Sequence, residues 1–406
     1  MNKRILLIGS LDTKGEEFRY VQRLIRDRGD STLIIDTGIM GDPVLEPDIH
    51  ASEVAVAGGG TIHELREKKD RARAVDVMLT GVQKLVPQLY HKKLFDGVLS
   101  LGGGTGTNIA TAAMRELPLG VPKVMVSTLA SSDVSAFVRD KDIMMLYSIA
   151  DIAGLNRISR QIFANAVGAI CGMVEESVDI STDKPLIAAT MFGVTTPCVT
   201  RFREQMEKAG YEVVIFHATG SGGRAMEALI DDGYFDGVAD FTTTEIADEV
   251  VGGFISAGPE RLDAAIRAKI PQLISCGALD MVNFFEYESV PEEFRNRNLY
   301  KHNPTVTLLR TNTAESKKIG RFIADKLNRA EAPVTLLLPL KGLSEIDKEG
   351  LPFYDHVADT MLFDTLKKKL DSHIRVVEVD AHINDTHFSD RAAEEFLKNM
   401  KTAGHN

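Results

Sequence analysis

The segment KRILLIGSLDTKGEEFRYVQRLIRDRGDSTLIIDTG (residues 3–38) carries the pattern that decides the fold class. A short apolar run at residues 5–8 precedes a polar turn, and residues 16–27 then show the apolar spacing of a helix. A glycine follows that helix, and a second apolar run occupies residues 32–35. Apolar runs joined by a helix are typical of parallel strands that helices cover on both faces. We therefore expect an α/β fold.

The same alternation continues through the first half of the chain. Apolar runs at residues 97–101, 124–127 and 144–147 are predicted to be further strands. Residues 156–176 place apolar side chains at helical spacing, and Asn156 is a suitable residue to cap that helix. These elements together predict a parallel sheet with helices on its two faces.

The second half repeats the layout of the first. Residues 184–220 follow the pattern of residues 3–38, FDGVADFTTTEIA (235–247) corresponds to FDGVLSLGGGTGT (95–107), and residues 269–281 correspond to 120–133. A repeat of this length indicates two copies of one domain. We expect two tandem Rossmann-like domains, residues 1–180 and 181–406, with a polar seam at 178–184. The second copy is predicted to carry extra strands at 334–338 and 375–379.

Composition limits the function classes. The formal net charge of −11 disfavours a nucleic-acid partner, because binding to phosphate backbones depends on clustered Lys and Arg. No apolar stretch reaches the length of about 18 residues that a membrane span requires, and the first apolar run is too short for a signal peptide. The three cysteines, Cys171, Cys198 and Cys276, match no disulfide or metal spacing. We expect a cytoplasmic protein without a membrane partner.

Four loops of the first domain follow predicted strands and should open at one edge of the sheet. They are SLDTKGEE (10–17), DTGIMGD (36–42), GGGTGTN (102–108) and STLASSD (127–133). Ligands of open parallel sheets bind at the carboxyl ends of the strands, near the point where strand order reverses. These small and hydroxyl-rich loops therefore form the first candidate binding site.

The glycine loop is the most distinctive of the four. Gly102, Gly103, Gly104 and Gly106 allow positive φ angles, with which successive N–H groups could surround an anion, and Thr107 or Asn108 could cap the next helix. Thr105 lies within the same loop. The loop has neither the lysine of a Walker motif nor the spacing of a dinucleotide fingerprint. It is thus either a phosphate-binding loop or only a close turn from strand to helix.

Charged and hydroxyl side chains stand near that loop. Lys14 could supply a positive charge for a phosphate, and Asp12 or Asp36 could hold Mg²⁺ or a ribose hydroxyl. The alternative is that Asp12 and Thr13 only cap the following helix. The loop that begins at Ser127 and Thr128 either adds hydroxyls to the site or is simply polar.

The second domain replaces the glycine loop with TTTE and places acids, bases and cations after its strands. Such a set is what a catalytic cleft for a small molecule needs. The candidates are His217, Arg224, Glu245, Asp280, Lys341, His382 and Asp385. His382 and His387 are spaced too loosely to predict a metal site, so we predict none.

Ordered blocks along nearly the whole chain resemble the N-terminal region of the tomato mosaic virus resistance protein family and its bacterial relatives, described as resistance-protein-like ATP-binding domains. The blocks are DTK (12–14), LGGGTGT (101–107), PLGVPKVMVSTLAS (118–131), DIAGLNRIS (151–159), TMFGVTTPCV (190–199), IFHATGSGGRAME (215–227), TTTEIADEVVGG (242–253), GALDMVNF (277–284) and HIND (382–385).

The resemblance implies a two-domain homodimer that binds ATP in its first domain. Carried over by motif position, the ATP site comprises Asp12, Thr13, Lys14, Gly102, Gly103, Gly106, Thr107, Ser127 and Thr128. The loop departs from the family pattern at Gly104, Thr105 and Asn108, which puts a hydroxyl contact in doubt. We expect an ATP-binding protein, with Mg²⁺, that acts on a small oxygenated metabolite. The alternatives are an ATP-gated module that binds another protein without turnover, and an ATP-independent hydrolase or lyase in the second domain.

Overall fold

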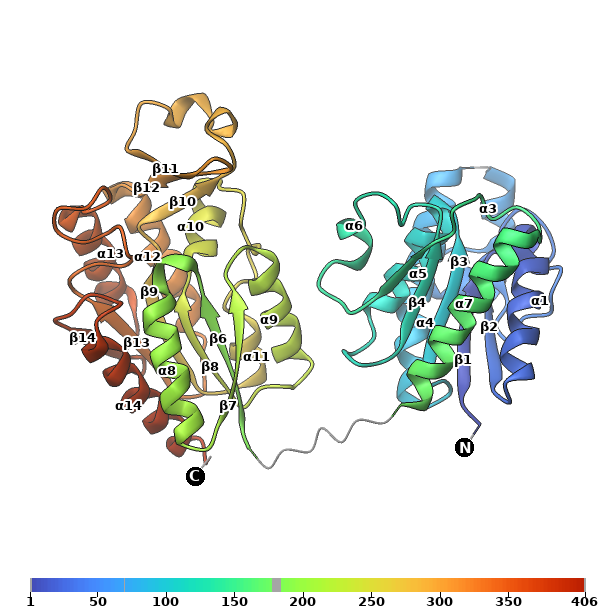
Figure 1. The fold of residues 1–406 in the computed structure, drawn as a ribbon, viewed down its shortest axis with the longest axis horizontal. Coiled ribbons are helices and arrows are strands. Elements are labelled where there is room, and N and C mark those ends of the chain that lie inside the picture. Colours follow the sequence, from blue (N-terminus) through green and yellow to red (C-terminus); the bar gives the residue numbers. More distant parts are fainter. Residues whose placement is uncertain (1, 69, 177–183, 405–406) are drawn as a thin grey trace. The chain divides into compact units, whose positions relative to one another are not determined.

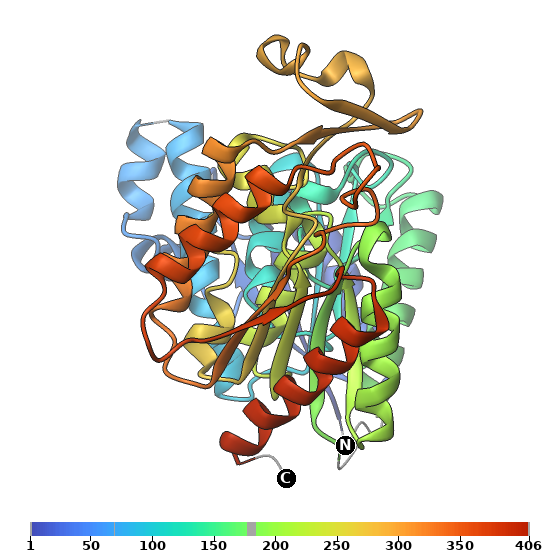
Figure 2. The same ribbon diagram turned by 90° about the vertical axis from the view of Figure 1, so that its left-hand side faces the viewer.

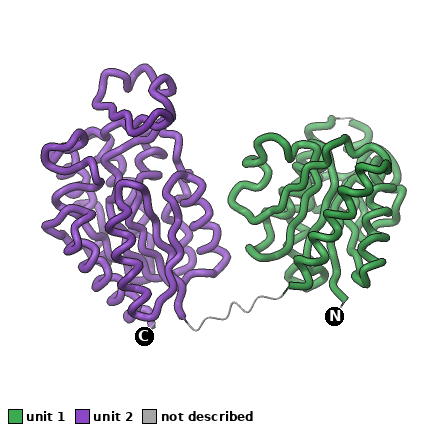
Figure 3. The backbone as a smooth tube through the Cα atoms, in the orientation of Figure 1, with its two compact units in different colours: residues 1–180 green, residues 181–406 purple. Residues whose placement is uncertain are grey.

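The computed structural model describes residues 2–68, 70–176 and 184–404. The chain forms two compact units, residues 1–180 and 181–406 (Figure 3). Of the expected seam at 178–184, all but Lys184 lies outside the described residues.

Unit 1 is a five-stranded parallel sheet with the strand order β2-β1-β3-β4-β5 (Figure 1). Its strands are β1 (Arg4–Gly9), β2 (Ser31–Asp36), β3 (Gly97–Gly102), β4 (Lys123–Ser127) and β5 (Met144–Tyr147). Its helices are α1 (Leu11–Asp27), α2 (Ala51–Ala57), α3 (Ile62–Lys68), α4 (Arg71–His91), α5 (Gly104–Arg115), α6 (Ser135–Val138) and α7 (Arg157–Glu175). All five predicted strands are confirmed, with ends shifted by at most one residue.

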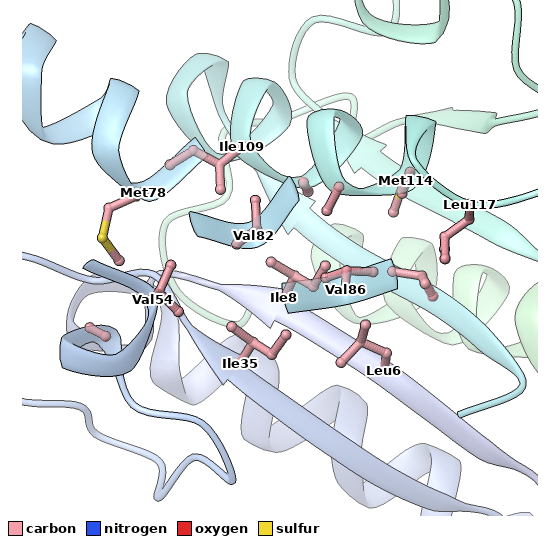
Figure 4. Close-up of a cluster of buried hydrophobic side chains, with 14 of the residues drawn as sticks. Leu6, Ile8, Ile35, Val54, Met78, Val82, Val86, Ile109, Met114 and Leu117 are labelled. Atoms are coloured by element: carbon pink, nitrogen blue, oxygen red, sulfur yellow. The ribbon is translucent and has the colours of Figure 1, made fainter. Parts of the chain in front are cut away.

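Alternate residues of β1 point to opposite faces of this sheet, as the two-residue period of a strand requires. Leu6 and Ile8 pack under α2, α4 and α5, whereas Ile5 and Leu7 pack under α1 and α7. Figure 4 shows the first of these clusters, with Leu6, Ile8, Ile35, Val54, Met78, Val82, Val86, Ile109, Met114 and Leu117. Every central strand is therefore covered on both faces, which accounts for its continuous apolar sequence.

The start of α1 corrects a sequence-based expectation. Residues 11–15 were expected in a loop, but the helix begins at Leu11, and only Ser10 separates it from β1. The Leu11 N–H is bound by the carboxylate of Asp36, 3.0 Å away at the end of the neighbouring strand. Because the acceptor comes from another strand, no local capping residue is needed. By contrast, the predicted cap of α7 is confirmed: Asn156 accepts from the N–H groups of Ile158 and Ser159.

Unit 2 contains a six-stranded parallel sheet with the order β14-β13-β9-β8-β6-β7. Its strands are β6 (Leu186–Met191), β7 (Glu212–His217), β8 (Gly237–Thr242), β9 (Gln272–Gly277), β13 (Val334–Pro339) and β14 (Arg375–Val379). Its α-helices are α8 (Thr196–Lys208), α9 (Ser221–Asp231), α10 (Thr244–Val251), α11 (Ala264–Ala268), α12 (Thr313–Leu327), α13 (His356–Lys369) and α14 (Thr386–Thr402). A small antiparallel sheet of β10 (Met281–Phe284), β12 (Val306–Arg310) and β11 (Leu299–Asn303) stands beyond the carboxyl ends of the main strands (Figures 1 and 2).

The two units share one topology. Strands β6, β7, β8 and β9 have the same neighbours as β1, β2, β3 and β4, and the register agrees, because Gly97 pairs with Ile5 and Gly237 with Ile187. Unit 2 extends this core with β13 and β14, the two strands expected there. The predicted fold class, two tandem Rossmann-like domains with mainly parallel sheets, is confirmed. Across the described parts of the chain, no helix is both long and apolar enough to span a membrane.

Candidate functional site

A cavity of about 650 Å³ opens at the carboxyl ends of β1, β2 and β3. The strand order of unit 1 reverses between β1 and β3, the point at which open parallel sheets bind ligands. The cavity is lined by Ser10, Asp12, Thr13, Thr37, Ile39, Met40, Leu65, Arg66, Asp70, Arg71, Ala74, Val75, Met78, Thr105 and Ile109. Three of the residues predicted to form a site, Asp12, Thr13 and Thr105, are among them.

The glycine loop does not form the predicted anion nest. None of Gly102, Gly103, Gly104 and Gly106 has a positive φ; α5 begins at Gly104 with Gly103 as its N-cap residue. The expected caps Thr107 and Asn108 are therefore already inside the helix. What the loop offers an anion is the amino end of α5, with free N–H groups in its first turn and a partial positive charge.

Gly102 is glycine because of close packing. A Cβ atom there would lie 2.9 Å from Cα of Gly106 and 3.1 Å from N of Thr107, both backbone atoms of α5. At Gly104, by contrast, the nearest atom would be a side-chain carbon of Leu129 at 3.8 Å. The fold thus requires glycine at 102 but not at 104.

Replacing Gly102 by alanine is expected to lower the free energy of unfolding of unit 1 by about 1–3 kcal/mol, because the backbone of α5 must move. The matched change Gly104→Ala should be neutral or stabilising by up to about 1 kcal/mol, since alanine favours helix over glycine. Hydrogen exchange of β3 and α5 peptides measures both. Equal effects of the two changes would show that the close contact at residue 102 is not what selects glycine.

Arg71 lines the cavity and lies beside the glycine loop. It is the first residue of α4, and its Nη2 donates to Oγ1 of Thr105 at 3.2 Å. Arg71 is not among the site residues predicted from the sequence. The N-cap aspartate before it, Asp70, signals where α4 begins, but only the packing of α4 against α5 brings Arg71 to the loop.

The loop between β2 and α2 is attached to the site by two side chains. Asp12 Oδ2 accepts from the N–H groups of Met40, at 2.8 Å, and Gly41, at 3.2 Å. Arg66 donates through Nε to the Ile39 carbonyl at 2.9 Å and also bonds to the Gly41 carbonyl. Oδ1 of Asp12 is buried and has no hydrogen-bond partner among the described residues. The residue itself lines the cavity.

Two predicted ligands of unit 1 are engaged elsewhere. The Lys14 ammonium donates to the carbonyl of Ile152, in the segment after β5, and Lys14 does not line the cavity. Asp36 accepts through Oδ1 from the N–H groups of Leu11 and Gly38, and burial raises the pKa of its carboxyl. Both residues hold α1 and its surroundings in place, and the structure places Arg71 where Lys14 was expected.

The hydroxyls predicted around the glycine loop mainly bond to one another. Thr107 Oγ1 and Ser127 Oγ are 2.7 Å apart and buried, and Ser127 Oγ also accepts from the Leu129 N–H. The N–H of Thr128 donates to the carbonyl of Gly102. Asn108 is exposed on α5. These residues fix the position of α5 against β4.

In unit 2 the residue Glu245 is fully buried and its carboxylate is fully bonded. Oε1 accepts from the N–H groups of Gly220, at 2.6 Å, and Gly223, at 3.0 Å. Oε2 accepts from Nε of Arg261 at 2.8 Å. Arg261 is itself buried and makes two bonds to Asp240, at 2.5 and 2.8 Å. Glu245 thus belongs to an internal ion-pair cluster.

Asp280 and His382 meet at Ser344 in a second buried cluster. Asp280 Oδ2 accepts from the Ser344 hydroxyl at 2.7 Å, and His382 Nε2 lies 2.8 Å from the Ser344 carbonyl. The His382 Nδ1 accepts from the N–H of Asn384, so Nε2 carries the hydrogen. Burial raises the pKa of Asp280 to about 7. Asp385 accepts from the His382 N–H at 2.9 Å and completes this group.

The remaining residues expected in the second-domain cleft have separate partners. His217 is exposed and stacks on Phe192, with ring centroids 5.5 Å apart. Arg224 Nη1 donates to the carbonyl of Ser256, and Lys341 pairs with Asp380 at 3.0 Å. Within the described part of the chain, no group of three or more His, Cys, Asp or Glu side chains is arranged to hold a metal ion. The structure thus joins Asp280, His382 and Asp385 in one cluster, whereas the side chains of Glu245, His217, Arg224 and Lys341 contact other partners.

Comparison with known proteins identifies relatives along the whole chain. Residues 3–179 match the N-terminal domain, and residues 184–400 the C-terminal domain, of an uncharacterised protein family (UPF0261). A UPF0261 protein of Clostridium tetani is 50% identical over 99% of this chain and 100% of its own length. One of Rhizobium meliloti is 45% identical, over 96% of this chain and 97% of that protein.

The tomato protein of the predicted resemblance is also a relative. The ToMV resistance protein Tm-1(GCR237) of Solanum lycopersicum is 37% identical over 97% of this chain, which matches 55% of the tomato protein. The predicted relationship is thus confirmed; the ATP-binding description attached to it stays a prediction. Among solved structures, UDP-N-acetylglucosamine 2-epimerase from Rickettsia bellii matches 100% of this chain and 97% of its own, at 9% identity and a TM-score of 0.24.

Proposed function

The chain belongs to the uncharacterised protein family UPF0261, and from the geometry of unit 1 we propose that it binds ATP in the cavity at the carboxyl ends of β1, β2 and β3. The observation that carries the proposal is the combination of a helix amino end, an arginine and an apolar wall around one space of about 650 Å³. Cavities that hold small ligands and cofactors measure about 300–1,000 Å³.

The phosphates would bind at the amino end of α5. The first-turn N–H groups of this helix have no acceptor within it, and its dipole favours negative charge. The guanidinium of Arg71, next to Thr105, adds a full positive charge at the same place. Arginine binds phosphate oxygens through two parallel hydrogen bonds, which orients the phosphate as well as attracting it.

The apolar part of the cavity supports a base-binding role. Ile39, Leu65, Val75, Met78 and Ile109 line it, from the β2–α2 loop and from α3, α4 and α5. A planar base would gain affinity there by removing apolar surface from water.

The residues present also fit a magnesium ion. Mg²⁺ in phosphate sites is held by one or two carboxylates together with phosphate oxygens and water. Asp12, whose buried Oδ1 has no hydrogen-bond partner in the part of the chain that the structure describes, would hold the ion; Lys14 and Asp36 are engaged elsewhere. Bound Mg²⁺ would neutralise part of the phosphate charge. Asp12 itself would keep the β2–α2 loop closed over the site through Met40 and Gly41.

ATP binding in unit 1 is compatible with two functions: an ATP-dependent enzyme that acts on a small metabolite, and an ATP-gated module that binds another protein. The proposal of an ATP-independent hydrolase or lyase in unit 2 receives less support. Glu245 is fully buried, and its carboxylate oxygens are bonded to Arg261 and two N–H groups.

Arg71→Ala is expected to weaken ATP–Mg²⁺ binding by about 10- to 100-fold, because one charge-assisted hydrogen-bonding group is lost. Isothermal titration calorimetry of the full chain measures this. Arg71 is exposed in the free protein, so the fold should be unaffected. The matched control is Arg160→Ala, an exposed arginine on α7, which covers the opposite face of the sheet.

Two results would contradict the proposal. The first is the absence of binding heat for the wild-type chain at millimolar ATP with Mg²⁺. The second is equal affinity of the Arg71→Ala and Arg160→Ala variants, which would place the nucleotide outside this cavity.

A further inference from the structure

Thr105 and Glu245 occupy equivalent positions in the two units. Thr105 is the second residue of α5, which follows β3, and Glu245 is the second residue of α10, which follows β8. Each lies eight residues after the glycine that pairs with the first central strand, Gly97 in unit 1 and Gly237 in unit 2. Both side chains therefore stand at the point where the strand order of their sheet reverses.

In unit 2 the anion-binding groups at this point are already bonded to Glu245. The backbone donors are the N–H groups of Gly220 and Gly223, around the start of α9, and the cation is Arg261. Gly223 even requires the absence of a side chain, since a Cβ there would lie 2.1 Å from Oε2 of Glu245. The Glu245 carboxylate thus occupies the donors that an external anion would otherwise use.

In unit 1 the residue at the corresponding position, Thr105, carries no charge, and the carboxylate of Asp12 at this site is bonded to two N–H groups of the β2–α2 loop. Arg71 contacts the short side chain of Thr105, and the amino end of α5 faces the same region. Thr105 is half-buried and lines the cavity, whereas Glu245 is completely buried. The exchange of threonine for glutamate at one position therefore distinguishes an open site from a closed one.

We propose that the residue at position 105 determines whether this fold accepts an anion from solution, so that the chain binds one nucleotide, in unit 1, and unit 2 is closed by Glu245. This inference rests on the proposed function for the identity of the ligand. An anion entering unit 2 would have to displace the Glu245 carboxylate from Arg261 and leave it buried without a partner, which is strongly unfavourable.

Thr105→Glu in the full chain tests the inference by copying the unit 2 arrangement into unit 1. Thr105→Gln is the matched control, because glutamine has nearly the same size as glutamate but carries no charge. Thr105→Ser keeps the hydroxyl and should bind like the wild-type chain. Calorimetry with ATP–Mg²⁺ should give one site per chain for the wild type. The glutamate variant should bind at least about 30-fold more weakly than the glutamine variant, because like charges would be brought together.

The outcomes separate this inference from the proposed function. Two nucleotides per chain, or equal affinities of the glutamate and glutamine variants, would overturn the inference while ATP binding itself stands. If the wild-type chain takes up no ATP, the proposed function fails, and the same variants are titrated with pyrophosphate. Binding of pyrophosphate to the wild type but not to the glutamate variant would support the anion site; no binding to either would overturn it.

Discussion

Replacing Arg261 by methionine is expected to lower the free energy of unfolding of unit 2 by about 3–5 kcal/mol. Methionine keeps much of the aliphatic volume of the side chain but removes the guanidinium. Three acidic side chains, Glu227, Asp240 and Glu245, would then lose their shared cation. Removing one partner of a buried ion pair is costly because the remaining charge stays out of water without compensation.

The geometry of the cluster explains why this effect should be large. Arg261 is almost completely buried, and its guanidinium reaches Asp240 at 2.5 Å, Glu245 at 2.8 Å and Glu227 at 3.2 Å. Asp240 lies in β8, Glu245 in α10 and Glu227 in α9, so the side chain of Arg261 connects three elements. Burial raises the pKa of Glu227, which indicates that negative charge is already costly there with Arg261 present.

Arg267→Met is the matched control for this prediction. Arg267 pairs with Asp231 at 2.6 Å, but both side chains are largely exposed, and such pairs contribute less than about 1 kcal/mol. Amide hydrogen exchange of α10 and β9 peptides in the full chain gives the local free energies of opening. Similar losses of protection in the two variants would contradict the structural role assigned to Arg261.

The fold could be predicted because its signals are local and repeated. Continuous apolar runs such as residues 5–8 identify strands covered on both faces, and the second half repeats the same order of elements. The start of α1 was missed because its first N–H is bound by Asp36, a residue of another strand. Local capping rules cannot detect an acceptor that only the register of β1 and β2 brings into place.

The candidate site was predicted only in part, for the same physical reason. The edge of the sheet and Asp12, Thr13 and Thr105 follow from strand order and loop composition. Arg71 precedes the glycine loop by more than thirty residues and reaches it only through helix packing. Residue type also does not reveal whether a charge is already neutralised, as with Glu245 and Arg261.

The stability of unit 2 is expected to fall as the pH rises from 5 to 8. Asp280, Asp347 and Asp359 surround one buried guanidinium, Arg310, which lies 2.7 Å from Asp359 and 3.6 Å from Asp347. Burial raises the pKa of all three carboxyls, that of Asp280 to about 7 and that of Asp359 to about 8. One cation cannot balance three carboxylates in this interior, so the cluster retains protons near neutral pH.

The direction of this pH dependence follows from the number of protons bound by the native and the unfolded chain. Between pH 5 and 8 the native cluster holds protons that the unfolded chain, with carboxyl pKa values near about 4, has already released. Unfolding therefore releases protons, and each one lowers the free energy of unfolding by about 1.4 kcal/mol per pH unit.

Asp359→Asn should make this pH dependence shallower, by up to about 1.4 kcal/mol per pH unit, because one proton-binding group is gone while an amide oxygen remains for Arg310. Asp364→Asn removes an exposed carboxylate from the same helix, α13, and should leave the slope of the wild type unchanged. Protection of α13 and β9 amides, measured from pH 5 to 8 and corrected for intrinsic exchange, gives the three slopes. A wild-type slope of zero would mean that all three carboxyls are ionised in the native protein. Equal, non-zero slopes for the wild type and both variants would mean that Asp359 does not hold the extra proton.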